Sequence, residues 1–312
     1  MTPALITLAR RELTLLALPR GSVVVTAVSG GPDSMALLHV LAKLASEVGV
    51  VVHAHGVDHG LRTEAAAELD LAERFADHLD VRFTRTVVEL PRGGNLQARA
   101  RTARYAALAA AARRVGARTI ATAHHADDRA ETVLMRLMRG AGPRGLAVLP
   151  PRGPLASEPE LELARPLIRA RRSAVMAHVE RHAVPFAVDP SNANPRFLRA
   201  RVRREVMPLL ESLAPGITLH LNALADQLAT EGPAEGGDTS DSFPLSRSVQ
   251  LALAEMVRSR STTARVWLPN GIVAKLEPQR ADSEAQARAP SRPQPRAARA
   301  RARRGRAGRD DP

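Results

Sequence analysis

The sequence predicts an α/β fold, with a parallel sheet and helices on both faces. Between residues 23 and 140, short runs rich in β-branched residues alternate with longer Ala- and Leu-rich stretches that are typical of helices. The expected strands are residues 23–28, 50–57, 81–88 and 118–123. Polar clusters follow these strands, and an open parallel sheet binds its ligands at the carboxyl ends of its strands. The pattern therefore predicts a ligand site along that edge.

After residue 140 the composition changes. Residues 140–165 are rich in Gly and Pro, which predicts a connecting loop. Helices are expected over residues 169–182, 197–213 and 219–230, so a smaller, mainly helical region follows the sheet. The chain thus divides into a core over residues 1–150 and a second, largely helical part over residues 151–230.

The remaining residues fall into two further parts. Residues 231–244, EGPAEGGDTSDSFP, have the composition of a linker. A helix over 245–260 and a hairpin over 265–277 are expected after it, so residues 231–280 form a small C-terminal region. From Ala281 onward the Arg, Ala and Pro bias cannot support a packed core, which predicts a disordered basic tail over 281–312.

The net charge is strongly basic and unevenly placed. The 312 residues carry a formal charge of +13, and residues 285–312 hold nine arginines against Asp310 and Asp311. Because aromatic residues make up only 2%, the charge favours contact with RNA through phosphates over broad stacking surfaces. A solvated charged surface is the alternative.

The sequence also excludes several classes of protein. There is no cysteine, which rules out disulfides, cysteine-ligated zinc, iron–sulfur clusters and a persulfide relay in this chain. Near the N-terminus, Arg10, Arg11 and Glu12 interrupt the apolar residues, so no secretion signal is expected, and no later stretch approaches a membrane span. We therefore expect a cytoplasmic protein with no membrane partner.

The segment VVVTAVSGGPDSMALLHVL, residues 23–41, joins a β-rich run to a helical pattern through a glycine-containing loop. Glycines at this place let backbone N–H groups approach an anion, and the helix N-terminus adds a positive dipole end. The carboxylate of Asp33 would repel a phosphate unless a divalent cation lies between them. The loop therefore predicts a metal–nucleotide site, although the usual GxxxxGKS/T phosphate loop is absent.

The second expected strand ends in VVHAHGVDHGLR, residues 51–62, where three histidines lie close to Asp58 and Arg62. Their mixed strand and loop placement lacks a recognised zinc spacing. A polar strand end that faces a nucleotide base is therefore favoured over a metal site.

An arginine-rich helix is predicted by NLQARARTARYAAL, residues 95–108. Gln97, Arg101 and Arg104 follow one another at helical offsets, with Tyr105 beside them. Arginines on one helical face suit phosphate or developing negative charge, and a solvated face is the alternative.

The segment ATAHHADDRAETVLMRLMRG, residues 121–140, leaves a strand and enters a helix. His124, Asp128 and Glu131 share one helical face, and His125 lies three residues before Asp128. The helix dipole alone favours acidic residues at this end. However, Asp128 lies at the same edge of the predicted sheet as Asp33, so the two are predicted to hold one Mg²⁺ against a triphosphate.

Four arginines open a later helix in DPSNANPRFLRARVRREVMPLL, residues 189–210: Arg199, Arg201, Arg203 and Arg204. Alternate-residue spacing does not keep one helical face, so these side chains are expected to fan out and to reach more than one partner. Solvated charge is the alternative.

Taken together, these segments resemble the PP-loop ATP pyrophosphatase superfamily, and within it the tRNA(Ile)-lysidine synthetase family. The superfamily mark is SGGxDS, here SGGPDS. The family marks are VDHGLR at 57–62, AR..RY ending in Arg104-Tyr105, HHADDRAET at 124–132, ARPL at 164–167, and DPSN followed by FLRARVR..VMPLL. The resemblance covers residues 20–213; Ala200 stands where the family usually has Asn, and the part after residue 230 matches poorly.

The resemblance implies a fold and a reaction. The fold is a PP-loop nucleotide-binding domain with a helical, tRNA-contacting region after it. The reaction splits ATP, with Mg²⁺, between its α and β phosphates and places AMP on the C2 oxygen of the wobble cytidine in a CAU-anticodon tRNA(Ile). The ε-amino group of free L-lysine then displaces AMP to give lysidine, and decoding changes from AUG to AUA.

Carried over position by position, the resemblance also implies residue roles. The residues that cradle pyrophosphate and metal are Ser29, Gly30, Gly31, Pro32, Asp33 and Ser34, with Asp33 and Asp128 as the Mg²⁺ ligands. The reaction-centre group is Arg104, His125 and Glu131, where His125 or Glu131 receives a proton from the lysine amine. Arg201 or Arg203 steadies the α-phosphate or the tRNA backbone.

Other functions stay open at this point. Cytidine thiolation in tRNA shares an adenylated intermediate, but the enzymes of that kind that resemble this chain use cysteines. A PP-loop amide synthetase for small molecules would need no RNA. A basic RNA-binding module with a decayed site is the non-enzymatic alternative, although Asp33, Asp128 and Glu131 are all present. The sequence does not distinguish a monomer from a homodimer.

Overall fold

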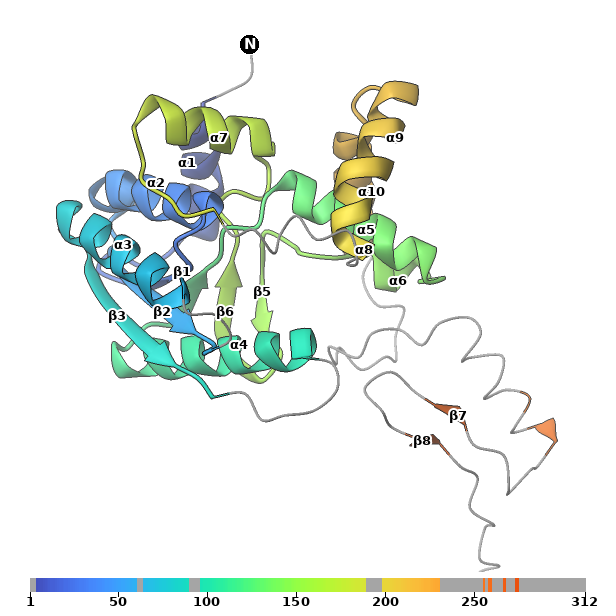
Figure 1. Cartoon of the computed structure of the whole chain (residues 1–312), viewed down its shortest axis with the longest axis horizontal. Helices are drawn as coiled ribbons and strands as arrows, with labels where there is room; N and C mark the ends of the chain where they lie inside the picture. The colour runs from blue at the N-terminus through green and yellow to red at the C-terminus, as the bar shows by residue number, and fades with distance from the viewer. Residues whose placement is uncertain are drawn as a thin grey trace, which may run out of the picture.

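In the computed structural model, the chain forms a six-stranded sheet flanked by helices (Figure 1). The structure describes residues 4–60, 64–89, 96–188 and 198–230, and a few positions between 255 and 274. The strands are β1 (Val23–Val28), β2 (Val51–Asp58), β3 (Arg82–Val87), β4 (Thr119–Ala121), β5 (Arg152–Leu155) and β6 (Glu158–Ala164). They lie in the order β3-β2-β1-β4-β6-β5, and all neighbours are parallel except β5 with β6. The predicted α/β fold is confirmed.

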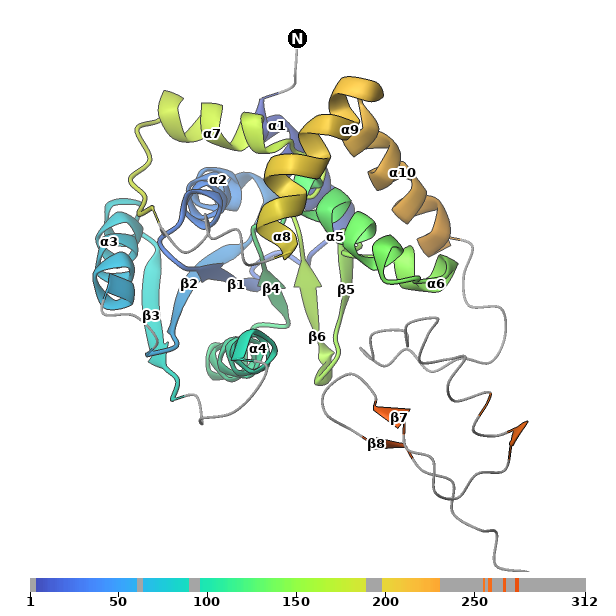
Figure 2. The ribbon, with the colours of Figure 1, turned by 45° about the vertical axis from the view of Figure 1, so that its right-hand side comes forward.

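Helices cover both faces of this sheet. They are α1 (Leu5–Leu16), α2 (Pro32–Val48), α3 (Glu64–His78), α4 (Leu96–Arg114), α5 (Ala126–Met138), α6 (Pro143–Leu146), α7 (Arg172–Arg181), α8 (Leu198–Arg201), α9 (Met207–Leu213) and α10 (Ile217–Thr230). Figure 2 shows α1, α2 and α7 on one side of the sheet and α4 on the other. Among the helices of the described part of the chain, none is both long and apolar enough to cross a bilayer.

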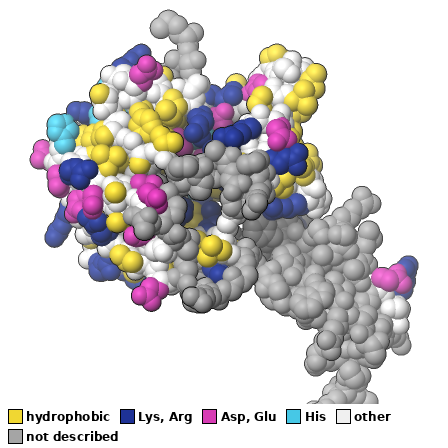
Figure 3. All heavy atoms as spheres, in the orientation of Figure 1, with side chains coloured by type: hydrophobic (Ala, Val, Ile, Leu, Met, Phe, Trp, Pro, Cys, Tyr) yellow, Lys and Arg dark blue, Asp and Glu magenta, His cyan; other side chains and the backbone are white. Residues whose placement is uncertain are grey.

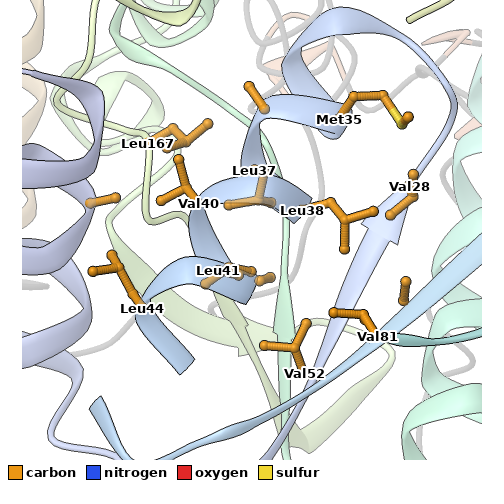
Figure 4. Close-up of a cluster of buried hydrophobic side chains, with 14 of the residues drawn as sticks. Val28, Met35, Leu37, Leu38, Val40, Leu41, Leu44, Val52, Val81 and Leu167 are labelled. Atoms are coloured by element: carbon orange, nitrogen blue, oxygen red, sulfur yellow. The ribbon is translucent and has the colours of Figure 1, made fainter. Parts of the chain in front are cut away.

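The main core lies between the central strands and α2. This helix is apolar almost all round, and Met35, Leu37, Leu38 and Leu41 are at most 1% exposed. Their side chains pack against strand residues and against the segment before α7 (Figure 4). Apart from Thr26, β1 is apolar throughout, as expected for a parallel strand that is covered on both faces. This core therefore holds the β1–α2 connection in place at the carboxyl end of a central strand.

The connecting loop predicted over residues 140–165 is wrong. This stretch contains α6 and the antiparallel pair β5–β6, and β6 joins the sheet beside β4. Leu161 and Leu163 are buried while the glutamates between and beside them are not, which is the alternation of a half-buried strand. Gly and Pro are tolerated here because β5 is an edge strand. Residue 150, the predicted end of the core, lies between two strands of one sheet.

A helical region follows the sheet and packs on α5. The helices expected over 169–182, 197–213 and 219–230 are present as α7, α8 to α9, and α10, with a π-helical turn at Val202–Val206 between α8 and α9. Ala130 of α5 packs against Val202 and Met207, and Val133 packs against Ala225 of α10. The α9–α10 pair projects from the sheet layer and carries exposed hydrophobic side chains (Figure 3).

The remaining predictions concern the part of the chain after residue 230. Strands β7 (Val266–Trp267) and β8 (Val273–Ala274) pair antiparallel, which confirms a hairpin within 265–277. The linker over 231–244 and the tail over 281–312 lie outside the described residues, as does most of the helix expected over 245–260. The four-part domain division stays a prediction.

Three buried histidines stabilise the fold only in their neutral form. His39 of α2 and His178 of α7 share a hydrogen bond, with Nδ1 and Nε2 2.9 Å apart. Burial, aided by the charge of His182, lowers the pKa of each to about 4. His55 of β2, which contacts Thr84 and Thr86 of β3, is fully buried, and burial likewise lowers its pKa to about 4.

The free energy of unfolding is therefore expected to fall as pH drops from 6.5, the ordinary value for histidine, toward 4. In this window the unfolded chain takes up protons that the folded chain excludes, which costs about 2 kcal/mol for each such histidine by pH 5. Denaturant titrations at pH 7.5 and pH 5 measure the loss. His178→Gln keeps a hydrogen-bonding side chain that does not titrate, so an equally large loss in this variant would contradict the assignment.

Candidate active site

The connection from β1 to α2 forms a tight loop over residues 29–31. Gly30 has a φ of +78°, and Gly31 caps α2 with Pro32 in its first turn. The Ser34 hydroxyl accepts the N–H of Ser29 at 3.1 Å and donates to the carbonyl of Gly31 at 2.9 Å. The loop is thereby folded over the first turn of α2, whose N–H groups have no acceptor within the helix. This is the geometry of an anion site.

Gly30 is required at its position by two independent features. An added Cβ would lie 2.7 Å from the backbone oxygen of Glu68, and the positive φ disfavours any L side chain. Gly30→Ala is therefore expected to lower the free energy of unfolding by about 2 kcal/mol or to displace the loop.

Gly31→Ala is the matched control, because its Cβ would meet only Ser29 Oγ at 3.7 Å and its φ is −76°. Urea titrations of both variants measure the difference. Equal stability of the two alanine variants would argue against the described loop.

Three predicted site residues, Asp33, His125 and Asp128, lie close together beyond the ends of β1 and β4. His125 follows β4, is fully buried and caps α5. Its Nδ1 accepts the N–H of Asp128 at 3.3 Å, so we infer that the ring proton is on Nε2. Nε2 lies 3.4 Å from Asp128 Oδ2 and 3.8 Å from Asp33 Oδ1. The imidazole therefore lies between two carboxylates that come from different helices.

These two carboxylates differ in their surroundings. Burial raises the pKa of Asp33 despite the nearby His125 and Arg172, and its buried Oδ1 has no hydrogen-bond partner within the described residues. Burial would also raise the pKa of Asp128, but His125 and Arg199 outweigh it and lower that pKa to about 2. Asp128 is therefore firmly ionised, whereas Asp33 has an unpaired acceptor.

The carboxylate pair fits a hard cation that takes only some of its ligands from protein. Within the described part of the chain, no group of three or more His, Cys, Asp and Glu side chains is arranged to hold a metal ion by itself. Mg²⁺ commonly binds to one or two carboxylates and completes its shell with phosphate oxygens and water. Asp33 with its unpaired Oδ1, and Asp128, fit that donor set.

Two arginines from the α8 region reach across to α5. Glu131, only 2% exposed, accepts Nε of Arg199 at 2.9 Å and Nε of Arg203 at 2.6 Å. Both guanidiniums also donate to Asp128 Oδ1, at 2.8 Å and 3.1 Å. Burial alone would lower the pKa of Arg203, but the bond to Glu131 raises it, so the guanidinium stays charged. The site thus combines fixed positive charge with the carboxylates.

The other predicted arginines lie elsewhere. Arg201 is exposed and pairs with Glu205 one turn along the helix, at 3.0 Å. Arg104 of α4 donates its Nε to His59 Nε2 at 3.4 Å, which joins two of the predicted segments to each other. Of the candidates, the structure brings together Asp33, His125, Asp128, Glu131 and Arg203.

Arg199 is the residue that sequence reasoning left out of the catalytic group. Its spacing of four from Arg203 is the available signal, because residues four apart share one face of a helix. His124, beside the site, donates to or accepts from Thr122 Oγ1 at 2.9 Å, and burial lowers its pKa to about 3. It is therefore neutral at physiological pH.

The sequence is similar to PP-loop proteins and to curated tRNA(Ile)-lysidine synthases. The family model described as PP-loop domain matches residues 6–210. The chain is 43% identical over 197 residues to the tRNA(Ile)-lysidine synthase of Novosphingobium aromaticivorans, covering 63% of this chain and 59% of that protein. It is 47% identical over 194 residues to the tRNA(Ile)-lysidine synthase of Rhodopseudomonas palustris, covering 60% and 54%.

A solved structure shows a related fold. The U34-tRNA thiolase NcsA from Methanococcus maripaludis matches with a TM-score of 0.61 at 19% sequence identity, covering 76% of this chain and 84% of that chain. At that identity the likeness shows the fold alone. The chain spans about half the length of the curated relatives that it matches.

Proposed function

Because this chain belongs to the PP-loop domain family, and within it to the tRNA(Ile)-lysidine synthetase family, we propose that it is an ATP-dependent ligase that forms lysidine in tRNA. It joins free L-lysine to C2 of the wobble cytidine of a CAU-anticodon tRNA(Ile), through an adenylated cytidine, with ATP converted to AMP and diphosphate. The observation that carries the proposal is the buried imidazole between Asp33 and Asp128, faced by Arg199 and Arg203, beside the SGGPDS loop.

The first step that the residues support is activation of the cytidine. The loop of residues 29–34, with the first turn of α2, binds the diphosphate part of ATP. Asp33 and Asp128 would hold Mg²⁺, which when bound neutralises phosphate charge. Arg199 and Arg203 lie on Asp128 and stabilise the negative charge that develops on the α-phosphate.

The second step is attack by the lysine amine, which must lose a proton. The two predicted acceptors are His125 and Glu131. Glu131 already accepts three hydrogen bonds from Arg199 and Arg203, so its oxygens are occupied. Nδ1 of His125 accepts the N–H of Asp128, so either acceptor would have to release one of these hydrogen bonds to take the proton.

RNA binding and cellular context complete the proposal. The α8–α10 region and the basic tail contact the tRNA body, so affinity should weaken with salt. A cytoplasmic location is the part of the proposal that rests on the sequence alone.

The decisive measurement is ATP-to-AMP turnover with Mg²⁺ and labelled lysine, using CAU-anticodon tRNA(Ile) and the same tRNA with uridine at the wobble position. Label is expected only in the intact tRNA. AMP release without RNA would instead indicate a small-molecule substrate. Thiolation is disfavoured, because the chain has no cysteine.

A further inference from the structure

A second aspartate in the first turn of α5, Asp127, has contacts with α7. Its Oδ2 accepts the backbone N–H of Arg172 at 2.7 Å, and its Oδ1 accepts Nε of Arg171 at 3.2 Å. The N–H of Ala126 also donates to the carbonyl of Ala170 at 2.8 Å. The turn that holds His125 and Asp128 is therefore fixed to the start of α7.

Arg171 continues this connection to α9. Its Nη2 lies 3.1 Å from Oε1 of Glu211. Glu211 in turn accepts the N–H of Gly216 at 2.8 Å and the hydroxyl of Thr218 at 2.6 Å, at the turn into α10. The hydrogen bond from Thr218 is the main cause of a lowered pKa of Glu211, so this carboxylate is ionised at neutral pH. We call Asp127, Arg171 and Glu211 the brace.

The brace joins the two halves of the candidate active site, and its Asp127 borders that site, with Oδ2 3.7 Å from Nδ1 of His125. The carboxylates Asp128 and Glu131 lie on α5, whereas Arg199 and Arg203 lie near the start of the helical stretch 198–213. Glu211 is near the other end of that same stretch. Val202 and Met207, in the middle of the stretch, pack on Ala130 of α5, and the brace adds a polar contact near the end that lies away from the arginines. Contacts along the whole stretch limit its pivoting on α5.

We propose that Arg171 is a positioning residue that holds the guanidiniums of Arg199 and Arg203 at a fixed place relative to the α5 carboxylates. It acts through Asp127 and Glu211, with which its guanidinium pairs. The inference deepens the proposed function and rests on it for the activity measurement, but its geometric content is independent of any reaction.

The test compares Arg171→Met with Arg171→Lys in the full chain. Turnover of Arg171→Met is expected to fall at least about tenfold, because small misplacements of catalytic groups lower rates steeply. The KM for ATP should change less than about threefold, since the loop of residues 29–34 is untouched. Arg171→Lys retains a cation that reaches one partner and should recover part of the rate. Arg10→Met, which breaks the exposed Arg10–Glu47 pair between α1 and α2, is the matched control.

A second readout needs no activity. The chain has no cysteine, so spin labels can be placed at Leu137→Cys on α5 and Leu213→Cys on α9, which are 51% and 73% exposed. Arg171→Met is expected to broaden the distance distribution between the labels, and Arg10→Met to leave it unchanged. An unchanged distribution overturns the proposal, whatever the turnover. Broadening in a protein that never ligates lysine would support the brace and reject the proposed function instead.

Discussion

Asp33→Asn is expected to abolish turnover while leaving the free energy of unfolding unchanged or higher. The side chain keeps its shape but loses the charge that a cation and its bound phosphates require, so a fall of at least ~10²–10³-fold is expected. Burial raises the pKa of Asp33, which means that the ionised carboxylate destabilises the folded chain at neutral pH. Asparagine removes that cost.

The combination of the two effects is what identifies a functional residue. Replacing a carboxylate that serves only the fold lowers the free energy of unfolding. Replacing a buried charge that is kept for chemistry raises it. AMP release and urea titration of the same preparation measure both quantities. Asp77→Asn, at an exposed position of α3, controls for the change in net charge. Retained turnover in Asp33→Asn would remove Asp33 from the site.

Arg203→Ala is expected to lower turnover about 100-fold and to change affinity for a non-hydrolysable ATP analogue less than about threefold. The guanidinium is fixed on Glu131 and Asp128 before any ligand arrives, so it is placed to stabilise charge that develops during the reaction. Glu131 keeps its bond to Arg199, which limits the loss of stability in the variant to about 1–3 kcal/mol.

Arg201→Ala is the control that separates the effect of the Arg203 contacts from the effect of losing one positive charge. Arg201 lies on the same helical stretch but pairs with Glu205 in solvent, so its loss should lower turnover far less than loss of Arg203. Adenylation of tRNA and calorimetric titration of the analogue are measured for both variants. Equal losses in the two would mean that the arginines act through net charge on RNA and not through their contacts.

The sequence predicted those features that depend on short stretches of chain. The positions of four strands are predicted to within a few residues, because β-branched residues gather in them and Ala- and Leu-rich helical stretches separate them. The loop of residues 29–34 was located from its glycines and from the helix after it. The β5–β6 pair was missed, because its Gly and Pro content concealed the alternation of Leu161 and Leu163.

Which arginines meet the carboxylates was decided only by the tertiary structure. Arg203 and Glu131 are 72 positions apart, and their contact depends on how α8 and its π-helical turn pack on α5. Arg199 and Arg203 point toward α5 and pair with Glu131, whereas Arg201 lies in solvent. The alternate-residue spacing of the arginines does not predict which of them face α5. The brace is likewise formed by three separate segments. Sequence alone determined four of the six strands, the loop of residues 29–34 and the family, because these follow from local pattern and motif. Packing between distant helices determined the electrostatics of the site.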